Sequence, residues 1–395
     1  MKNIHNERFS IKEIRCAVLK PITLVRPFYD ASMGPFSSYQ MAILTLVDDS
    51  GCEGEVEFPV SGIPLLKGVF SPTILKQQGA NYSAIYSKLF WQIRNEGFRG
   101  SASMALGNLD RAFYDIAARR QSLPLHRYLG ADRDWVHVYA SGGSVSLSDE
   151  ELIEECLLYK SEGYTTVKIK AGGGLASHLD KDARRIEKVR KALGGDIRLA
   201  VDTNQAMSVK QTLGFIAQIE DLDICWLEEP IHSADILGIE EISSKTDMRI
   251  SYGESERTKY VFPLLQRAGV KHLQPIAGHI ISMDEWAEIG GLAEENNLMF
   301  SCGGTPSLNA QFVATQNQEA MCEYLMPLLT SMEPYYKIMP KYEQGKAWLP
   351  EMPGVSIRFD WERLKSEKAI EEVMVWKREI NSKTHVEETI RINGK

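Results

Sequence analysis

Three acidic residues are evenly spaced in the middle of the chain, and each follows a short apolar run. They are Asp202, Glu228 and Glu254. Their even spacing fits repeated strand-helix units, and in a (β/α)8 barrel the C-terminal ends of neighbouring strands converge on one face. Three carboxylates that meet there would bind a hard divalent cation, with Mg²⁺ as the best candidate and Mn²⁺ as the alternative. The spacing therefore predicts a metal site.

Two lysines end the run that precedes the first of these carboxylates. Alternate side chains of a strand share a face, so Lys168 and Lys170 are expected to point the same way. Like charges lower the pKa of a lysine, and a lysine so placed can act as a base near neutral pH. A solvated strand edge is the alternative. The position of the pair directly before the carboxylates favours the catalytic hypothesis.

The composition is that of an ordinary globular protein. The 395 residues are 44% hydrophobic and 25% charged, with a formal net charge of −8. The acidic balance argues against a nucleic-acid or anionic-membrane surface. No apolar run approaches the ~20 residues of a spanning helix, and we expect a cytoplasmic protein. Six scattered cysteines without a CxxC pair are typical of reduced thiols and make a structural zinc site unlikely.

From residue 136 onward, short β-rich runs alternate with amphipathic segments of helix length, such as 179–193 and 209–220. Eight such runs predict a barrel rather than a doubly wound sheet. The predicted strands are 136–141, 165–170, 197–202, 223–227, 248–253, 271–275, 298–302 and 322–326.

The segments on either side of the barrel predict an α+β cap. Residues 11–60 alternate as strands do, and residues 82–129 have helical periodicity. Residues 340–362 return to strand-and-turn character, which we interpret as a return to the cap. The charged segment 367–395 has a sparse apolar stripe at Ile370, Val373, Val375 and Trp376, and it predicts a solvated helix and tail packed on the cap or on a neighbouring subunit.

The predicted fold class is therefore α/β, a modified (β/α)7β TIM-type barrel with a capping domain built from both ends of the chain. We place the N-terminal cap at 1–132, the barrel at 133–335 and the C-terminal return with its tail at 336–395.

Taken in order along the chain, these features resemble the enolase superfamily, and most closely its mandelate racemase and muconate lactonizing branches. The resemblance is carried by the lysine pair, the three carboxylate strands, the Pro353-Gly354 return and two cap motifs. Those motifs are Ala105-Leu106-Gly107-Asn108-Leu109-Asp110 and Leu123-Pro124-Leu125-His126-Arg127-Tyr128-Leu129-Gly130. Each motif alone is weak, whereas the ordered set is specific.

The resemblance implies a role for each of these positions. In such enzymes a base removes the α-proton of a carboxylate substrate, and a divalent metal stabilises the resulting enediolate. Asp202, Glu228 and Glu254 would be the metal ligands, and Lys170 would be the base. Lys168 would lower the pKa of Lys170 and contact the substrate carboxylate. Asn204 would also contact the substrate.

The chain departs from both branches at the second base. The mandelate racemase branch has an Asp after the sixth strand and a His after the seventh, whereas here Gln274-Pro275 is followed by Ile276, and the segment 301–305 reads Ser-Cys-Gly-Gly-Thr. The lysine that the muconate branch has after the sixth strand is also missing from 273–279. Two-base racemisation needs a partner on each face, so the sequence predicts a one-base enzyme.

Four further residues are candidates for substrate binding. His279, in the loop after the sixth predicted strand, could supply the missing acid, and the alternative is a surface histidine. Glu323, near the end of the eighth, could hydrogen-bond substrate or serve as a structural cap. Arg26 and Tyr29, in the cap loop 23–35, suit a second carboxylate or a sugar hydroxyl, and a solvent-facing arginine is the alternative.

We therefore predict a Mg²⁺-dependent lyase that dehydrates an acid sugar, an aldonate or aldarate. A cycloisomerase or a racemase or epimerase of a carboxylate is the first alternative. A non-catalytic protein that kept the metal and ligand site is the second. The expected partner is a small-molecule carboxylate, with no nucleic acid and no membrane, and the resemblance implies a homo-oligomer.

Overall fold

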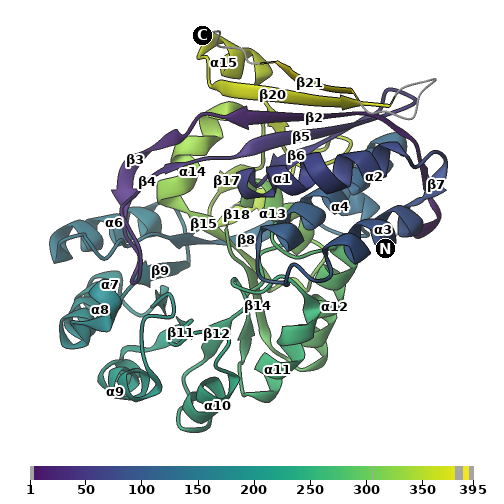
Figure 1. Cartoon of the computed structure of the whole chain (residues 1–395). Coiled ribbons are helices and arrows are strands. Elements are labelled where there is room, and N and C mark those ends of the chain that lie inside the picture. The colour runs from purple at the N-terminus through teal and green to yellow at the C-terminus, as the bar shows by residue number, and fades with distance from the viewer. Residues whose placement is uncertain (1–3, 305, 379–385, 391–395) are drawn as a thin grey trace.

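A computed structural model describes residues 4–304, 306–378 and 386–390, the last of these as backbone only. A barrel forms one part of the molecule, and a cap of strands and helices covers one of its sides (Figure 1). No helix in the described part of the chain is long and apolar enough to cross a membrane. The six cysteines are free thiols, four of them buried.

Eight parallel strands form the barrel, each hydrogen-bonded to the next, and β15 pairs with β8 to close it. Each of them coincides with a strand predicted from the sequence to within a few residues. The modified TIM-type barrel is thereby confirmed. The strands are β8 (Trp135–Ser141), β9 (Thr166–Lys170), β10 (Arg198–Asp202), β11 (Ile224–Glu228), β12 (Ile250–Tyr252), β13 (His272–Leu273), β14 (Met299–Cys302) and β15 (Met321–Leu325).

Helices connect successive strands around the outside of the barrel. Two begin with a capping box, in which Ser148 pairs with Glu151 and Ser208 pairs with Gln211, so the first backbone N–H groups are satisfied. The helices are α6 (Asp149–Ser161), α7 (Gly173–Ala176), α8 (Leu179–Leu193), α9 (Val209–Ile219), α10 (Ile236–Ser244), α11 (Phe262–Arg267), α12 (Met283–Glu295) and α13 (Pro306–Val313). The helix after the last barrel strand, α14 (Met326–Met332), turns to the cap and packs on β3 (Ile22–Phe28).

The barrel interior is packed with side chains. Tyr139, Ala200, Trp226 and Met321 form a buried cluster there. The ring of His272 lies edge-on to Trp226 at 4.9 Å between centroids. These rings fill the barrel, so a ligand can enter only at the mouth.

The cap is built from a five-stranded antiparallel sheet and helices. The sheet order is β21-β20-β2-β5-β6, and the hairpin β3–β4 extends from it towards the barrel (Figure 1). The N-terminal strands are β1 (Arg8–Phe9), β2 (Ile11–Leu19), β3 (Ile22–Phe28), β4 (Phe36–Tyr39), β5 (Ala42–Asp48), β6 (Glu53–Phe58) and β7 (Ala80–Asn81). The helices are α1 (Ile63–Leu65), α2 (Ser71–Leu75), α3 (Tyr82–Ile93), α4 (Ser101–Arg120) and α5 (Leu125–Tyr128).

Helix α4 of the cap contacts the loop after barrel strand β13. Arg111 is fully buried, and its guanidinium donates to the carbonyl of Ile280 at 3.0 Å. Gly107 faces the same carbonyl so closely that a Cβ would overlap its oxygen. The cap motif noted in the sequence thus places a glycine where the helix must approach the loop after β13.

The C-terminal part differs from the prediction in two ways. The hairpin β17 (Lys341–Glu343) and β18 (Lys346–Trp348) extends the barrel sheet by pairing with β8, whereas the sequence predicted that this segment belongs to the cap. The remaining elements are β16 (Tyr336–Ile338), β19 (Arg358–Phe359), α15 (Trp361–Ser366), β20 (Ile370–Lys377) and β21 (Val386–Ile390). The domain boundaries at 132 and 335 stay predictions.

The prediction of a helix and tail for 367–395 is wrong over residues 370–377, which form β20. This segment is a strand that pairs along most of β2, and Ile370, Met374 and Trp376 are buried there. Pairing with β2 buries apolar side chains of β20 that formed only a sparse stripe in the sequence. The β-branched residues of β20 also favour a strand. Residues 379–385 and 391–395 lie outside the described part of the chain.

Candidate active site

The three acidic residues and Lys170 come together at the C-terminal ends of neighbouring strands. In the parallel register, Lys170 of β9 lies beside Asp202 of β10, which in turn lies beside Glu228 of β11. Glu254 follows β12, after Gly253. One carboxylate oxygen from each of Asp202, Glu228 and Glu254 lies within 4.8 Å of the others, as a metal site requires.

Burial and mutual repulsion make this acidic cluster costly without a cation. Burial and the charge of Asp202 raise the pKa of Glu228 to about 8. Burial and the charge of Glu229 raise the pKa of Glu254 to about 8. The donor set is all carboxylate oxygen, which suits a hard divalent ion, and such an ion would relieve the repulsion. The residues present therefore fit Mg²⁺ or Mn²⁺.

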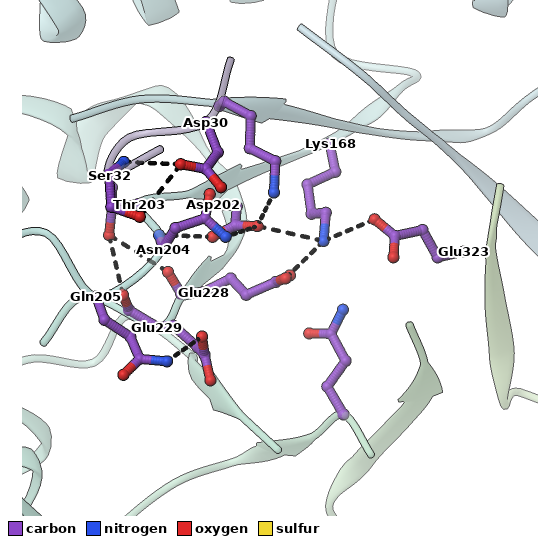
Figure 2. A network of polar contacts seen from close by, with 12 residues as sticks. Asp30, Ser32, Lys168, Asp202, Thr203, Asn204, Gln205, Glu228, Glu229 and Glu323 are labelled. Atoms are coloured by element: carbon purple, nitrogen blue, oxygen red, sulfur yellow. Dashed lines mark hydrogen bonds and ion pairs between the residues drawn. The ribbon is translucent and has the colours of Figure 1, made fainter. Parts of the chain in front are cut away.

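Lys168 is fully buried among carboxylates. Its Nζ lies 2.5 Å from Glu228 Oε1, 2.9 Å from Glu323 Oε1 and 3.6 Å from Asp202 Oδ2 (Figure 2). Burial lowers the pKa of Lys168, but the charges of Glu228 and Glu323 outweigh it and the pKa rises well above its ordinary value. Lys168 therefore remains a fixed positive charge.

Lys170 contacts Asp202 of the acidic cluster and also lines the cavity described below. Burial lowers the pKa of Lys170 and the Asp202 charge raises it, with a net rise above the ordinary value. The charge of Lys168 does lower the pKa of Lys170, as predicted. The prediction of a net lowering of that pKa is wrong for the metal-free chain. The reason is the direct contact with a carboxylate, and positive charge on the acidic cluster would act against that rise. Both lysines in turn hold the pKa of Asp202 down, to about 2, against the effect of burial.

A cavity of about 260 Å³ lies between the cap and the mouth of the barrel. From the barrel it is lined by Lys170, Asn204, Glu254, Ile276, Gly304, Glu323, Leu325, Pro327 and Leu328. From the cap it is lined by Leu24, Phe28, Asp30, Phe36, Ser38 and Tyr39. The site is thus completed by both parts of the fold.

Asn204 and Glu323, two of the residues predicted to contact substrate, both line this cavity. The backbone N–H of Asn204 donates to Asp202 Oδ1 at 2.9 Å, and its side-chain Nδ2 lies 3.3 Å from Asp202 Oδ2. The Asn204 Oδ1 atom is buried without a partner among the described residues. Glu323 accepts from Lys168 and from the Gly304 N–H at 2.8 Å. Burial raises the pKa of Glu323, but the two lysines outweigh it and lower the pKa.

A second layer of polar contacts supports the acidic cluster (Figure 2). Glu229 accepts from Gln205 Nε2 at 2.7 Å, and the same amide nitrogen lies 2.7 Å from Ser255 Oγ. Trp226 Nε1 donates to Glu228 Oε2 at 3.0 Å. Gln205 thus joins Glu229 to Ser255, the chain neighbour of Glu254.

Three of the predicted substrate contacts lie outside the cavity. The side chain of Arg26 is 49% exposed and pairs with Glu151 at 3.1 Å and Glu155 at 3.8 Å, because these acids of α6 lie beside the cap loop. Tyr29 holds the loop through its backbone N–H, which donates to Ser144 Oγ at 2.9 Å. His279 is not among the lining residues. Burial and the nearby Arg257 lower the pKa of His279 to about 3.

The cap residues Asp30, Ser38 and Tyr39 line the cavity but were missed from the sequence. Only the prediction that a cap loop covers the mouth pointed near them. Asp30 Oδ1 accepts from the N–H groups of Ser32 at 2.8 Å and Met33 at 2.6 Å, which is a local turn signal rather than a catalytic one. Nothing in that pattern indicates which loop residue faces the barrel.

Residues 151–363, more than half of the chain, match the family model described as enolase C-terminal domain-like. The chain belongs to this family. The L-talarate/galactarate dehydratase of Salmonella typhimurium strain LT2 is 25% identical over 348 residues, which is 85% of each chain. The 3,6-anhydro-alpha-L-galactonate cycloisomerase of Streptomyces coelicolor is 26% identical over 281 residues, covering 71% of this chain and 76% of the relative.

The chain shares its fold with a solved structure, that of a racemase from Streptomyces coelicolor A3(2) with bound magnesium. The TM-score is 0.84 at 22% sequence identity, and the match covers 91% of this chain and 99% of the racemase. The curated relatives include lyases and isomerases, and the chain is an enzyme. Which of these reactions it catalyses is a separate question.

Proposed function

We propose that the protein is a Mg²⁺-dependent lyase that removes water from an acid sugar, with Lys170 as the base that takes the α-proton. The observation that carries this proposal is the position of Lys170. It contacts Asp202 of the acidic cluster and also lines the cavity between cap and barrel. A substrate carboxylate held at the cluster would present its α-carbon to this amine.

Asp202, Glu228 and Glu254 would hold the Mg²⁺ ion. When bound, it would supply positive charge where negative charge develops on the substrate as the α-proton leaves. Lys168 adds a second fixed positive charge from below, because it is held between Glu228 and Glu323. Asn204 contributes both the orientation of Asp202 and a free carbonyl oxygen for a substrate hydroxyl.

The reaction balances with Lys170 alone. The neutral amine takes the proton from C2, and the electrons of the C2–H bond pass onto the substrate carboxylate. They then form the C2–C3 double bond as the C3–O bond breaks. The resulting ammonium returns its proton to the departing hydroxide, so water leaves. The enol then becomes a 2-keto-3-deoxy acid by taking a proton from solvent at C3 and releasing its C2 hydroxyl proton to solvent.

Cycloisomerisation is the second candidate, because it also begins with loss of one α-proton and one curated relative is a cycloisomerase. Its product has the same mass as its substrate, whereas dehydration removes one water. Mass spectrometry of the product separates the two.

The test is a screen of mono- and diacid sugars with Mg²⁺, in which semicarbazide traps 2-keto-3-deoxy products. Lys170→Ala is run in parallel, and Lys191→Ala, an exposed lysine on α8, is the matched control. A hit that Lys170→Ala abolishes and Lys191→Ala preserves supports the proposal. Silence across the library, or a product of unchanged mass, contradicts dehydration.

A further inference from the structure

The part of the cavity wall that does not belong to the metal-and-lysine set is largely apolar. Apart from the polar residues Asp30, Ser38, Tyr39, Asn204 and Glu323, the cap, the loop after β13, the last barrel strand and α14 present hydrocarbon side chains to the cavity. They include Leu24, Phe28, Phe36, Ile276, Leu325 and Leu328. Hydroxyl groups buried against such a wall would lose hydrogen bonds to water without replacement, which costs free energy.

The same wall lacks a cation for a second carboxylate. Among the described lining residues Lys170 is the only basic side chain, and it already contacts Asp202. Lys168 lies behind the wall, paired with Glu228 and Glu323. Arg26, which the sequence suggested as an anchor, is paired with glutamates of α6 instead. A second substrate carboxylate would therefore be buried without a counter-ion.

The carboxylate of Asp30, which lines the cavity, would in addition repel a second substrate carboxylate. Its Oδ1 atom accepts from two backbone N–H groups and, at 3.2 Å, lies beside the hydroxyl of Ser32, so the loop holds the carboxylate in place. A carboxylate held in a cavity wall attracts a hydroxyl donor and repels another carboxylate. The cap thus selects against a diacid.

We infer that the substrate is a monocarboxylic sugar acid whose far end is uncharged and poor in hydroxyls, such as a methyl-terminated deoxy chain or an anhydro ring. This inference rests on the proposed function and narrows its substrate class. It favours an aldonate over an aldarate. The volume of about 260 Å³ lies near the lower limit of ~300 Å³ for small-molecule pockets, which suits one small acid.

The experiment uses three six-carbon acids of the same configuration that differ only at C6, which carries a methyl group, a hydroxymethyl group or a carboxylate. The stereochemical series is the one that gives a hit in the screen. We expect kcat/KM to be highest for the methyl compound and about tenfold or more lower for the diacid. A diacid that is turned over best overturns the inference and leaves the proposed function intact.

Absence of turnover in every series contradicts the proposed function, and the inference is then tested by binding alone. Calorimetry with Mg²⁺ and the Lys170→Ala variant ranks the three acids without chemistry. The expected order of affinity is again methyl, hydroxymethyl, carboxylate. Tightest binding of the diacid overturns the inference in this arm as well.

Phe36→Arg tests the wall itself, because it adds a positive charge to the cavity. Phe36 is 37% exposed, so an arginine fits there without disturbing the core. Val25→Arg is the matched control, since Val25 belongs to the same hairpin, is 81% exposed and does not line the cavity. We expect Phe36→Arg to raise the diacid-to-methyl ratio of kcat/KM about tenfold, and Val25→Arg to leave it unchanged. Equal effects of the two variants contradict the inference.

Discussion

Lys168 Nζ lies 2.9 Å from Glu323 Oε1 and joins two strands of the barrel that are not neighbours. Lys168 belongs to β9 and Glu323 to β15, and β8 lies between these strands in the sheet. The same ammonium contacts Glu228 of β11 (Figure 2). One buried cation therefore holds carboxylates from two sides of the barrel mouth.

Lys168→Met should destabilise the metal-free protein by about 3 kcal/mol, because it leaves Glu228 and Glu323 buried without their counter-ion. Urea unfolding at pH 8 measures the difference. Lys210→Met, at an exposed position of α9, is the control and should change stability little. Equal stability of the two variants would show that Lys168 is not needed as a counter-ion.

Mg²⁺ should raise the melting temperature of the wild-type protein, because it binds the acidic cluster of the folded state only. At 100 times its Kd the ion would add about 2.7 kcal/mol. Glu254→Gln removes one ligand and should remove most of this shift, whereas Glu187→Gln on the exposed face of α8 should keep it. Differential scanning calorimetry with Mg²⁺ or EDTA makes the comparison. A full shift in Glu254→Gln would exclude it as a ligand.

Gly107→Ala should destabilise the protein although alanine is the better helix former by about 1 kcal/mol. The new Cβ would overlap the Ile280 carbonyl oxygen and force α4 away from the barrel. Gly214→Ala is the control, because Gly214 lies in α9 with no atom within 4 Å of an added Cβ, and it should stabilise. Thermal unfolding of the two variants and the wild type shows whether each substitution raises or lowers the melting temperature. A stabilising Gly107→Ala would contradict the close approach of cap and barrel.

The stability of the protein should depend on pH through Asp110 of α4. Burial raises the pKa of this carboxyl to about 7, above the ordinary value of 3.8, although Tyr82 and the Met283 N–H donate to it. Between these two values the folded state keeps a proton that the unfolded state has lost. Its contribution is therefore fully present below pH 3.8 and is lost as the pH rises towards 7.

Asp110→Asn removes this titration. Raising the pH from 5 to 7 should lower the stability of the wild type by about 2 kcal/mol relative to that of the variant. Urea unfolding of both proteins at several pH values gives the difference between their free energies of unfolding. The contributions of titrating groups that both proteins share cancel in this difference. A difference that stays constant with pH would contradict the raised pKa.

Much of the fold could be predicted from the sequence because a barrel repeats one local pattern. The strands from β8 to β15 follow from short apolar runs between amphipathic segments, and the register that aligns Lys170, Asp202 and Glu228 follows from the parallel sheet. The spacing of the acidic residues is a direct consequence of that repeat. Sequence periodicity was sufficient for these features because each is local.

The features that the sequence did not predict depend on contacts between distant segments. Strand β20 is a strand because β2, far away in the chain, pairs with it. Arg26 leaves the cavity because two acids of α6 attract it. The rise in the pKa of Lys170 comes from its contact with Asp202. The spacing of residues in the sequence does not show whether this contact or burial has the larger effect on that pKa. Asp30 lines the cavity only because the hairpin β3–β4 reaches the barrel mouth.

The most direct test of the central claim is incorporation of solvent deuterium. The substrate found in the screen is incubated in D₂O with Mg²⁺ and either the wild type or Lys170→Ala, and the product is examined by proton NMR. We predict a product with one deuteron at C3 from the wild type and no turnover by the variant. Turnover that persists in Lys170→Ala would contradict α-proton removal by Lys170, and a product without deuterium at C3 would contradict the loss of the α-proton with water.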